Sequence, residues 1–124
     1  MKDNRPVNLD FTTFKLPLPA ITSILHRVSG AIVFVGVALL LFLLDTSLES
    51  AEGFARVTEW LSNPLVKLVT WAVLAALLYH LLAGVKHLVM DLGIGETLTG
   101  GLLGAKIVLI LAVICFIAAG VWIW

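Results

Sequence analysis

Three long apolar stretches separated by short polar connections dominate this chain of 124 residues. Hydrophobic residues make up 60% of the chain and charged residues 13%, and the mean hydropathy of +1.09 lies outside the range of soluble globular domains. About 20 helical residues cross the core of a bilayer, and lipid offers no water to unpaired backbone groups. The sequence therefore predicts an all-α integral membrane protein whose three transmembrane helices form an up-down-up bundle.

The first helix must be longer than its uninterrupted apolar run. Residues 30–44 would extend only about 22 Å as a helix, which is too short for a bilayer core. Pro17 and Pro19 are tolerated at a helix start but not in a helix interior. We therefore expect the helix to begin just after them and to cover about residues 21–44.

Proline and glycine also mark the other two helices. Pro64 suits the opening of a second helix at about residues 65–92, which the glycines at 93 and 95 would end. The pair at Gly100 and Gly101 precedes a third helix at about residues 102–124. Residues 1–20 then form an N-terminal segment, residues 21–124 form a single transmembrane domain, and residues 50–60 of the polar loop are a candidate surface helix.

Lysine and arginine predict the orientation of the helices. Four of these cations lie before or near the start of the first helix, namely Lys2, Arg5, Lys15 and Arg27. Arg56 alone lies in the acidic first loop, with Lys67 just inside the second helix, and Lys86 and Lys106 flank the second loop. The positive-inside rule therefore places the N-terminus and the second loop in the cytoplasm, with the C-terminus outside. The chain's four tryptophans, Trp60, Trp71, Trp122 and Trp124, would form a belt on the outer side. A plain packing role is equally compatible with Trp71.

Several classes of function are disfavoured. The net charge is zero, so no basic excess points to a nucleic-acid partner. The lone Cys115 cannot form an intrachain disulfide, and no C-x-x-C motif is present to hold zinc, an iron–sulfur cluster or covalent haem. We expect Cys115 to face lipid or to pack against a neighbouring helix. The N-terminal segment resembles neither a secretory signal nor a transit peptide, so we expect no cleaved leader.

His80 is the residue that most needs a functional explanation, because it lies in the middle of the second apolar stretch. At about 100° per residue, one helical stripe contains His80, Gly84, His87 and Asp91. An imidazole deep in the membrane, a gap beside it and polar groups near the helix end suit haem, with His80 on the iron and His87 near the propionates. A six-coordinate haem would need its second ligand from another subunit. The alternative role for His80 is a hydrogen bond to a neighbouring helix.

A second polar group lies at the start of the first helix. Ser23, His26, Arg27 and Gly30 share one face, where a hydroxyl and a guanidinium could bind a headgroup whose oxygens gain charge during a reaction. The alternative is that Arg27 reaches lipid headgroups, His26 lies in the interface and Ser23 caps the helix.

These residues belong to recognisable motifs. The sequences SILHRVSG at residues 23–30, RPVNL at residues 5–9 and YHLLAGVKHLVMDLG at residues 79–93 closely resemble the cytochrome b membrane-anchor subunit of bacterial succinate dehydrogenase. The resemblance implies that His80 is an axial ligand of a b-type haem shared with a second hydrophobic anchor subunit. It further implies that Ser23 and Arg27 contact ubiquinone, and that His26 and His87 lie near the haem propionates. Lys86 stands where that family has an arginine, so the bidentate contact of a guanidinium would be lost there.

The resemblance implies a subunit of succinate:ubiquinone oxidoreductase in the bacterial inner membrane, which docks an iron–sulfur subunit and a flavoprotein subunit. The chain has no flavin or iron–sulfur motif, so succinate oxidation would occur elsewhere in the complex. A quinol:fumarate reductase anchor and a non-redox tether for soluble partners are the alternatives. An ion channel is disfavoured, because the third helix carries no series of polar groups. Three helices alone bury little, so we expect a second membrane subunit to complete the bundle.

Overall fold

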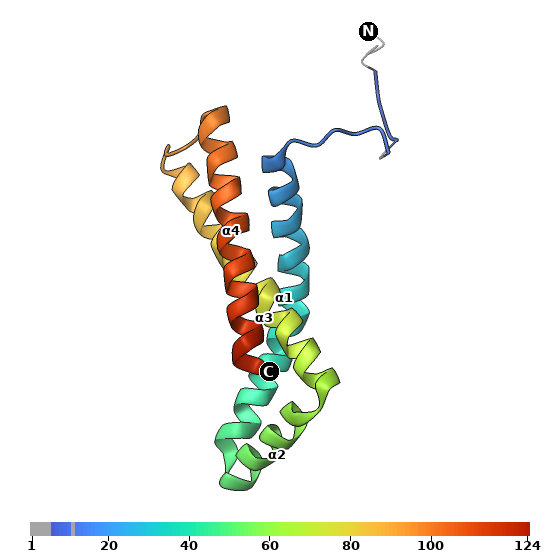
Figure 1. The fold of residues 1–124 in the computed structure, drawn as a ribbon, viewed down its shortest axis with the longest axis vertical. Coiled ribbons are helices and arrows are strands. Elements are labelled where there is room, and N and C mark those ends of the chain that lie inside the picture. The colour runs from blue at the N-terminus through green and yellow to red at the C-terminus, as the bar shows by residue number, and fades with distance from the viewer. Residues whose placement is uncertain (1–5, 11) are drawn as a thin grey trace.

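The fold of this chain, in a computed structural model that describes residues 6–10 and 12–124, consists entirely of helices. The helices are α1 (Leu18–Glu49), α2 (Ala51–Ser62), α3 (Pro64–Asp91) and α4 (Leu98–Ile123). Three of them, α1, α3 and α4, are long and apolar enough to cross a membrane. They run in alternating directions, with the start of α1 and the α3–α4 turn at the same end of an elongated molecule, which is the top in Figure 1. The predicted architecture is confirmed.

The helices extend beyond the apolar stretches from which they were predicted. Helix α1 begins at Leu18, since Pro19 fits within its first turn, and it continues past residue 44 to Glu49. Helix α4 begins at Leu98, where the Thr97 side chain accepts a hydrogen bond from the Gly100 amide. Gly100 and Gly101 therefore lie inside α4 and not before it.

The polar loop after α1 contains the expected surface helix, which is α2. Ser50 caps it by accepting a hydrogen bond from the Gly53 amide at 3.0 Å. Gly53 is buried against the carbonyl of Thr46 in α1, where a side chain would clash with backbone. Trp60 of α2 stacks on Phe42 of α1 with 5.8 Å between ring centroids. These contacts fold α2 back against the end of α1, below the C-terminus of α4 in Figure 1.

Small residues allow α3 to pack closely against its two neighbours. The buried residues of α1 include Thr22, Ser29, Gly36 and Leu43, a seven-residue spacing that keeps one face toward α3. Val73 of α3 lies directly over Gly36. On the other side, Trp71 packs over Gly120 of α4, stacks on Phe116 and donates a hydrogen bond to the Phe116 carbonyl at 3.0 Å. Trp71 is thus a packing residue between helices.

Little of the chain is buried within itself. The buried hydrophobic residues among those described are few and mostly small: Leu43, Val57, Val73, Ala83, Ala105, Val108 and Ala119. The free Cys115 is only half-buried on α4. A chain with so much apolar surface requires lipid or a further membrane protein around it.

Candidate functional site

Three histidines line one cavity between α1 and α3. The cavity has a volume of about 410 Å³ and is bordered by His26 of α1 and by His80, Leu81, Gly84, Val85, His87 and Leu88 of α3. It occupies the half of α3 that leads to its C-terminal end. The predicted stripe of His80, Gly84 and His87 is therefore confirmed as one surface. Asp91, the last member of that stripe, is exposed at the end of α3 and does not line the cavity.

The hydrogen bonds of His80 fix which of its ring nitrogens carries the proton. Its Nδ1 lies 3.1 Å from Ser29 Oγ and 3.1 Å from the carbonyl oxygen of His26. The Ser29 hydroxyl already donates to that same carbonyl at 2.7 Å, so its oxygen is an acceptor toward His80. With two acceptors facing it, Nδ1 is the protonated nitrogen. The lone pair on Nε2 is then free to bind a metal, and a hydrogen bond on the opposite nitrogen is what usually orients a metal-binding histidine.

His26 and His87 complete the polar part of the cavity. The His26 ring stacks on His80, with centroids 4.2 Å apart and planes 12° apart, and lies 5.1 Å from the tilted ring of His87. Nε2 of His26 is buried without a hydrogen-bond partner within the described residues. Buried polar atoms of this kind are rare and usually meet a ligand or water. The cavity therefore offers two histidines that could hold the acidic edge of a ligand.

The residues around the cavity fit haem. Two positions that face the histidines lack a side chain: a Cβ on Gly30 would lie 3.0 Å from Cε1 of His80, and one on Gly84 would lie 3.6 Å from Nε2 of His26. The rest of the lining is aliphatic, as a porphyrin requires. No group of three or more His, Cys, Asp or Glu residues in the described ranges could hold a bare metal ion. One oriented imidazole beside an apolar cavity is the donor set of a haem site and not of a zinc site.

Ser23 and Arg27 lie beside this cavity and do not line it. Both are on the first three turns of α1, where Ser23 is half-buried and Arg27 is exposed. Neither forms a hydrogen bond or an ion pair with the part of the chain that the structure describes. Ser23 therefore does not act as the helix cap considered above, since α1 begins five residues earlier without a side-chain cap. The hydroxyl and the guanidinium are both available to a ligand.

Three site residues were not identified from sequence alone. Ser29 contacts His80, and the Tyr79 hydroxyl donates a hydrogen bond to the Thr22 carbonyl at 2.8 Å, which ties α3 to α1 just before His80. Thr22 and Ser29 are both buried. A buried hydroxyl three residues after His26, on the same helical face, was the available signal for Ser29. Lys86, by contrast, lies along Gly104 of α4 and does not line the histidine cavity.

Known proteins are similar to this sequence over most or all of its length. Residues 1–119 match the model of the succinate dehydrogenase/fumarate reductase transmembrane subunit family. The chain belongs to this family. It is 44% identical to the succinate dehydrogenase cytochrome b556 subunit of Coxiella burnetii, over 100% of both chains. It is 37% identical to the succinate dehydrogenase cytochrome b556 subunit of Paracoccus denitrificans, over 76% of this chain and 72% of that one.

A mitochondrial relative belongs to the same group. The chain is 33% identical to the succinate dehydrogenase cytochrome b560 subunit of Mus musculus, over 90% of this chain and 67% of the mouse protein. Membership of a transmembrane-subunit family agrees with the three apolar helices, so the chain is a multi-pass membrane protein. In a succinate dehydrogenase/fumarate reductase transmembrane subunit, a cavity lined by three histidines is the natural candidate for the functional site.

Proposed function

We propose that this chain is the cytochrome b membrane anchor of a bacterial succinate:ubiquinone oxidoreductase, which binds one face of a b-type haem and forms part of the ubiquinone site. The observation that carries the proposal is the orientation of His80. Its Nδ1 is held by Ser29 and His26 of the neighbouring helix, so its Nε2 is free beside an apolar cavity. The alternative role for His80, a hydrogen bond between helices, is present but occupies only one ring nitrogen.

His80 would bind the haem iron through Nε2, and His26 and His87 would hold the propionates. The unpartnered Nε2 of His26 supports this role, because a buried nitrogen gains most from a charged partner. When bound, haem supplies a one-electron carrier inside the membrane. The chain's other two histidines, His26 and His87, are assigned to the propionates, which leaves no further imidazole of this chain for the iron. We therefore infer that a second hydrophobic anchor subunit gives the other axial ligand.

Ser23 and Arg27 would bind ubiquinone beside the haem. The Ser23 hydroxyl can donate a hydrogen bond to a quinone carbonyl oxygen. The Arg27 guanidinium remains charged, so it stabilises the anionic, reduced form of the quinone more than the neutral oxidised form. Both side chains are free of partners in the described ranges, which leaves their hydrogen-bonding capacity for a ligand.

The proposal places the start of α1 and the α3–α4 turn on the cytoplasmic side of the bacterial inner membrane, with the C-terminus in the periplasm. The cation count given above supports this orientation, although Lys2 and Arg5 lie outside the described residues. The quinone residues would then face the iron–sulfur subunit, which takes its electrons from the flavoprotein subunit. A quinol:fumarate reductase anchor would have the same architecture, and the relatives' names favour the succinate-oxidising direction.

Substitutions at Ser23 and Arg27 test the quinone site in the purified complex. Ser23→Ala should weaken the apparent affinity for quinone by up to about tenfold, since a net hydrogen bond contributes about 0.5–1.5 kcal/mol. Arg27→Leu should lower turnover even at saturating quinone, because the charge acts on the reduced form. Succinate oxidation with a soluble artificial acceptor should remain near the wild-type value in both variants.

Ser47→Ala and Lys106→Leu are matched controls, since neither residue lines the histidine cavity. The control variants should leave quinone turnover unchanged. Wild-type quinone turnover in an assembled Arg27→Leu complex would show that Arg27 only anchors the chain at the interface. A non-redox tether would leave both variants without effect on any activity.

A further inference from the structure

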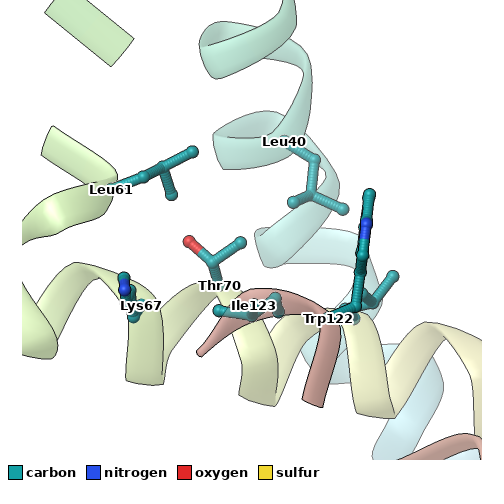
Figure 2. A pocket seen from close by; sticks show the side chains of 7 residues that line it. Leu40, Leu61, Lys67, Thr70, Trp122 and Ile123 are labelled. Atoms are coloured by element: carbon teal, nitrogen blue, oxygen red, sulfur yellow. The ribbon is translucent and has the colours of Figure 1, made fainter. Parts of the chain in front are cut away.

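A second cavity lies at the opposite end of the transmembrane helices from the histidines. It has a volume of about 370 Å³ and is bordered by residues from all four helices: Leu40, Leu61, Lys67, Thr70, Leu74, Trp122 and Ile123 (Figure 2). Thr70 and His80 are ten residues apart on α3, about 15 Å along its axis. Neither the haem nor the quinone site uses this cavity.

The lining combines a large apolar surface with two polar groups that have no hydrogen-bond or ion-pair partner among the described residues. Thr70 Oγ1 is buried and has no hydrogen bond within the described residues. Figure 2 shows this oxygen turned toward the space between Leu61 and Lys67. Lys67 has no ion pair in the described part of the chain, and its ammonium lies 5.3 Å from the ring centroid of Trp124. A buried hydroxyl and an unpaired cation both favour a ligand that brings acceptor oxygens.

The position of the cavity indicates where such a ligand comes from. Lys67 is in the first turn of α3, and Trp122 and Trp124 end α4, so the opening lies where charged and aromatic side chains meet the membrane surface. A cavity of this size with aliphatic walls favours an apolar guest over water. An apolar chain joined to an anionic headgroup satisfies both parts of the site, and the surrounding membrane supplies molecules of that kind.

We propose that this cavity is a binding site for an anionic phospholipid. One acyl chain lies against Leu40, Leu74 and Ile123, and the phosphate faces the Lys67 ammonium. The Thr70 hydroxyl donates a hydrogen bond to a phosphate or ester oxygen of the same lipid. Because all four helices border the cavity, a bound lipid would join α2 and the end of α4 to the α1–α3 pair.

Tryptophan quenching by brominated lipid tests the site directly, since Trp122 lines the cavity. The complex purified in neutral detergent is titrated with brominated phosphatidylglycerol and, separately, with brominated phosphatidylcholine. We expect the anionic lipid to quench at a concentration about fivefold lower, since one lysine near the surface contributes on the order of 1 kcal/mol to binding an anionic lipid. Lys67→Met keeps most of the aliphatic stem and should abolish this preference. Thr70→Val should weaken quenching by both lipids, and Lys106→Met, far from the cavity, should behave as wild type.

Equal quenching by the two lipids in the wild-type complex would overturn the proposal, as would a preference that survives in Lys67→Met. Displacement of quenching by a short-chain quinone, with the same dependence on Lys67 and without effect of phosphatidylglycerol, would also overturn it in favour of a second quinone site. Circular dichroism of each variant establishes that the helices are intact. Succinate oxidation is measured in the same samples and should not change, because the cavity lies away from Ser23 and Arg27.

Discussion

Ser29 determines how His80 presents itself to the cavity, because it accepts one of the two hydrogen bonds that fix Nδ1. Ser29→Ala leaves the His26 carbonyl as the remaining acceptor, so His80 should still bind haem but with less rigid orientation. Loss of a partner that orients a metal ligand typically weakens metal affinity by about 10- to 100-fold. We expect a retained b-type spectrum with haem transfer to apomyoglobin faster by about tenfold or more.

Ser47→Ala is the matched control for that variant. Ser47 also donates to the carbonyl three residues before it, Leu44, and it lies near the far end of α1. Its haem transfer should match that of the wild type. An unaltered transfer rate in Ser29→Ala would show that the hydrogen bond from His80 Nδ1 to Ser29 does not support the iron ligand.

Alanine substitutions at Gly30 and Gly84 compare a methyl group that crowds the His80 ring with one that makes an ordinary contact with His26. Gly30→Ala would place its Cβ 3.0 Å from Cε1 of His80, so the ring must shift and haem content should fall. Gly84→Ala makes only an ordinary contact, 3.6 Å from Nε2 of His26, and should be tolerated by the helices themselves. Haem content per assembled complex, measured from the pyridine haemochrome, should be lower in Gly30→Ala than in Gly84→Ala. The reverse order would show that His80 does not need its present position.

The sequence was most informative about single residues where helical periodicity applies. It placed His80, Gly84 and His87 on one surface, and the structure confirms that they line one cavity. It did not indicate that Ser29 and the His26 carbonyl orient the His80 ring, because these contacts cross between helices. Such contacts depend on the rotation of α1 against α3, which no local pattern encodes. The roles of Ser23, Arg27, His26 and His87 remain predictions.

Close contact between α1 and α3 depends on Gly36 and Val73. A Cβ on Gly36 would lie 2.5 Å from a Val73 methyl group, so Gly36→Ala should destabilise the pair by about 1–3 kcal/mol through overpacking. Val73→Ala in the same chain removes the methyl groups that clash and should restore most of the loss. Unfolding of the purified chain in mixed micelles by dodecyl sulfate, followed by circular dichroism, measures both variants.

The rescue distinguishes helix packing from a general effect of alanine. Gly104→Ala provides a comparison, because it meets only the flexible end of Lys86 at 3.2 Å and should be tolerated. A Gly36→Ala variant as stable as wild type, or one that Val73→Ala fails to rescue, would contradict the observed packing of α1 on α3.

The sequence predicted that the three long helices exist, but it predicted the residues at which α1 and α4 begin or end less well. Apolar runs mark the part of a helix inside lipid, whereas backbone hydrogen bonding continues into water wherever another element supports it. Residues 45–49 remain helical because buried Thr46 packs against Gly53 of α2. Gly100 could be read as a breaker, yet the Thr97 cap starts α4 before it, and the Gly95 backbone approaches Gly100 too closely for a side chain. In each case a contact with residues outside the helix overrides the helix preference of the residues at its end.

The orientation of the whole molecule in the membrane can be measured with reporter fusions. A periplasmic reporter joined after residue 52 or at the C-terminus should be active, and the same reporter in the turn between α3 and α4 should be inactive. The expectation follows from the positive-inside rule. A cytoplasmic C-terminus would contradict the orientation and would place Ser23 on the opposite side from a cytoplasmic electron donor.

At the scale of the whole molecule, composition predicted a membrane protein and the structure shows how incomplete its own core is. The large side chains along α1, α3 and α4 are mostly exposed, including Phe34 at 85% and Leu88 at 65%. Leu88 borders the histidine cavity, so that cavity opens on a surface that this chain does not cover. The sequence could not show which surface a partner would take, since that depends on a second chain.

The central claim is that His80 of this membrane anchor holds the iron of a b-type haem. The most direct test is the dithionite-reduced minus oxidised spectrum of the complex with His80→Ala, co-expressed with its genomic neighbours and normalised to the amount of assembled complex. The b-type band should be lost or severely altered, because the iron would lose the one imidazole that this chain gives it, while His26, the nearest other histidine, is assigned to the propionates. His87→Ala, which removes a histidine from the same cavity, should keep the band. A His80→Ala complex with an unchanged b-type spectrum would contradict the assignment.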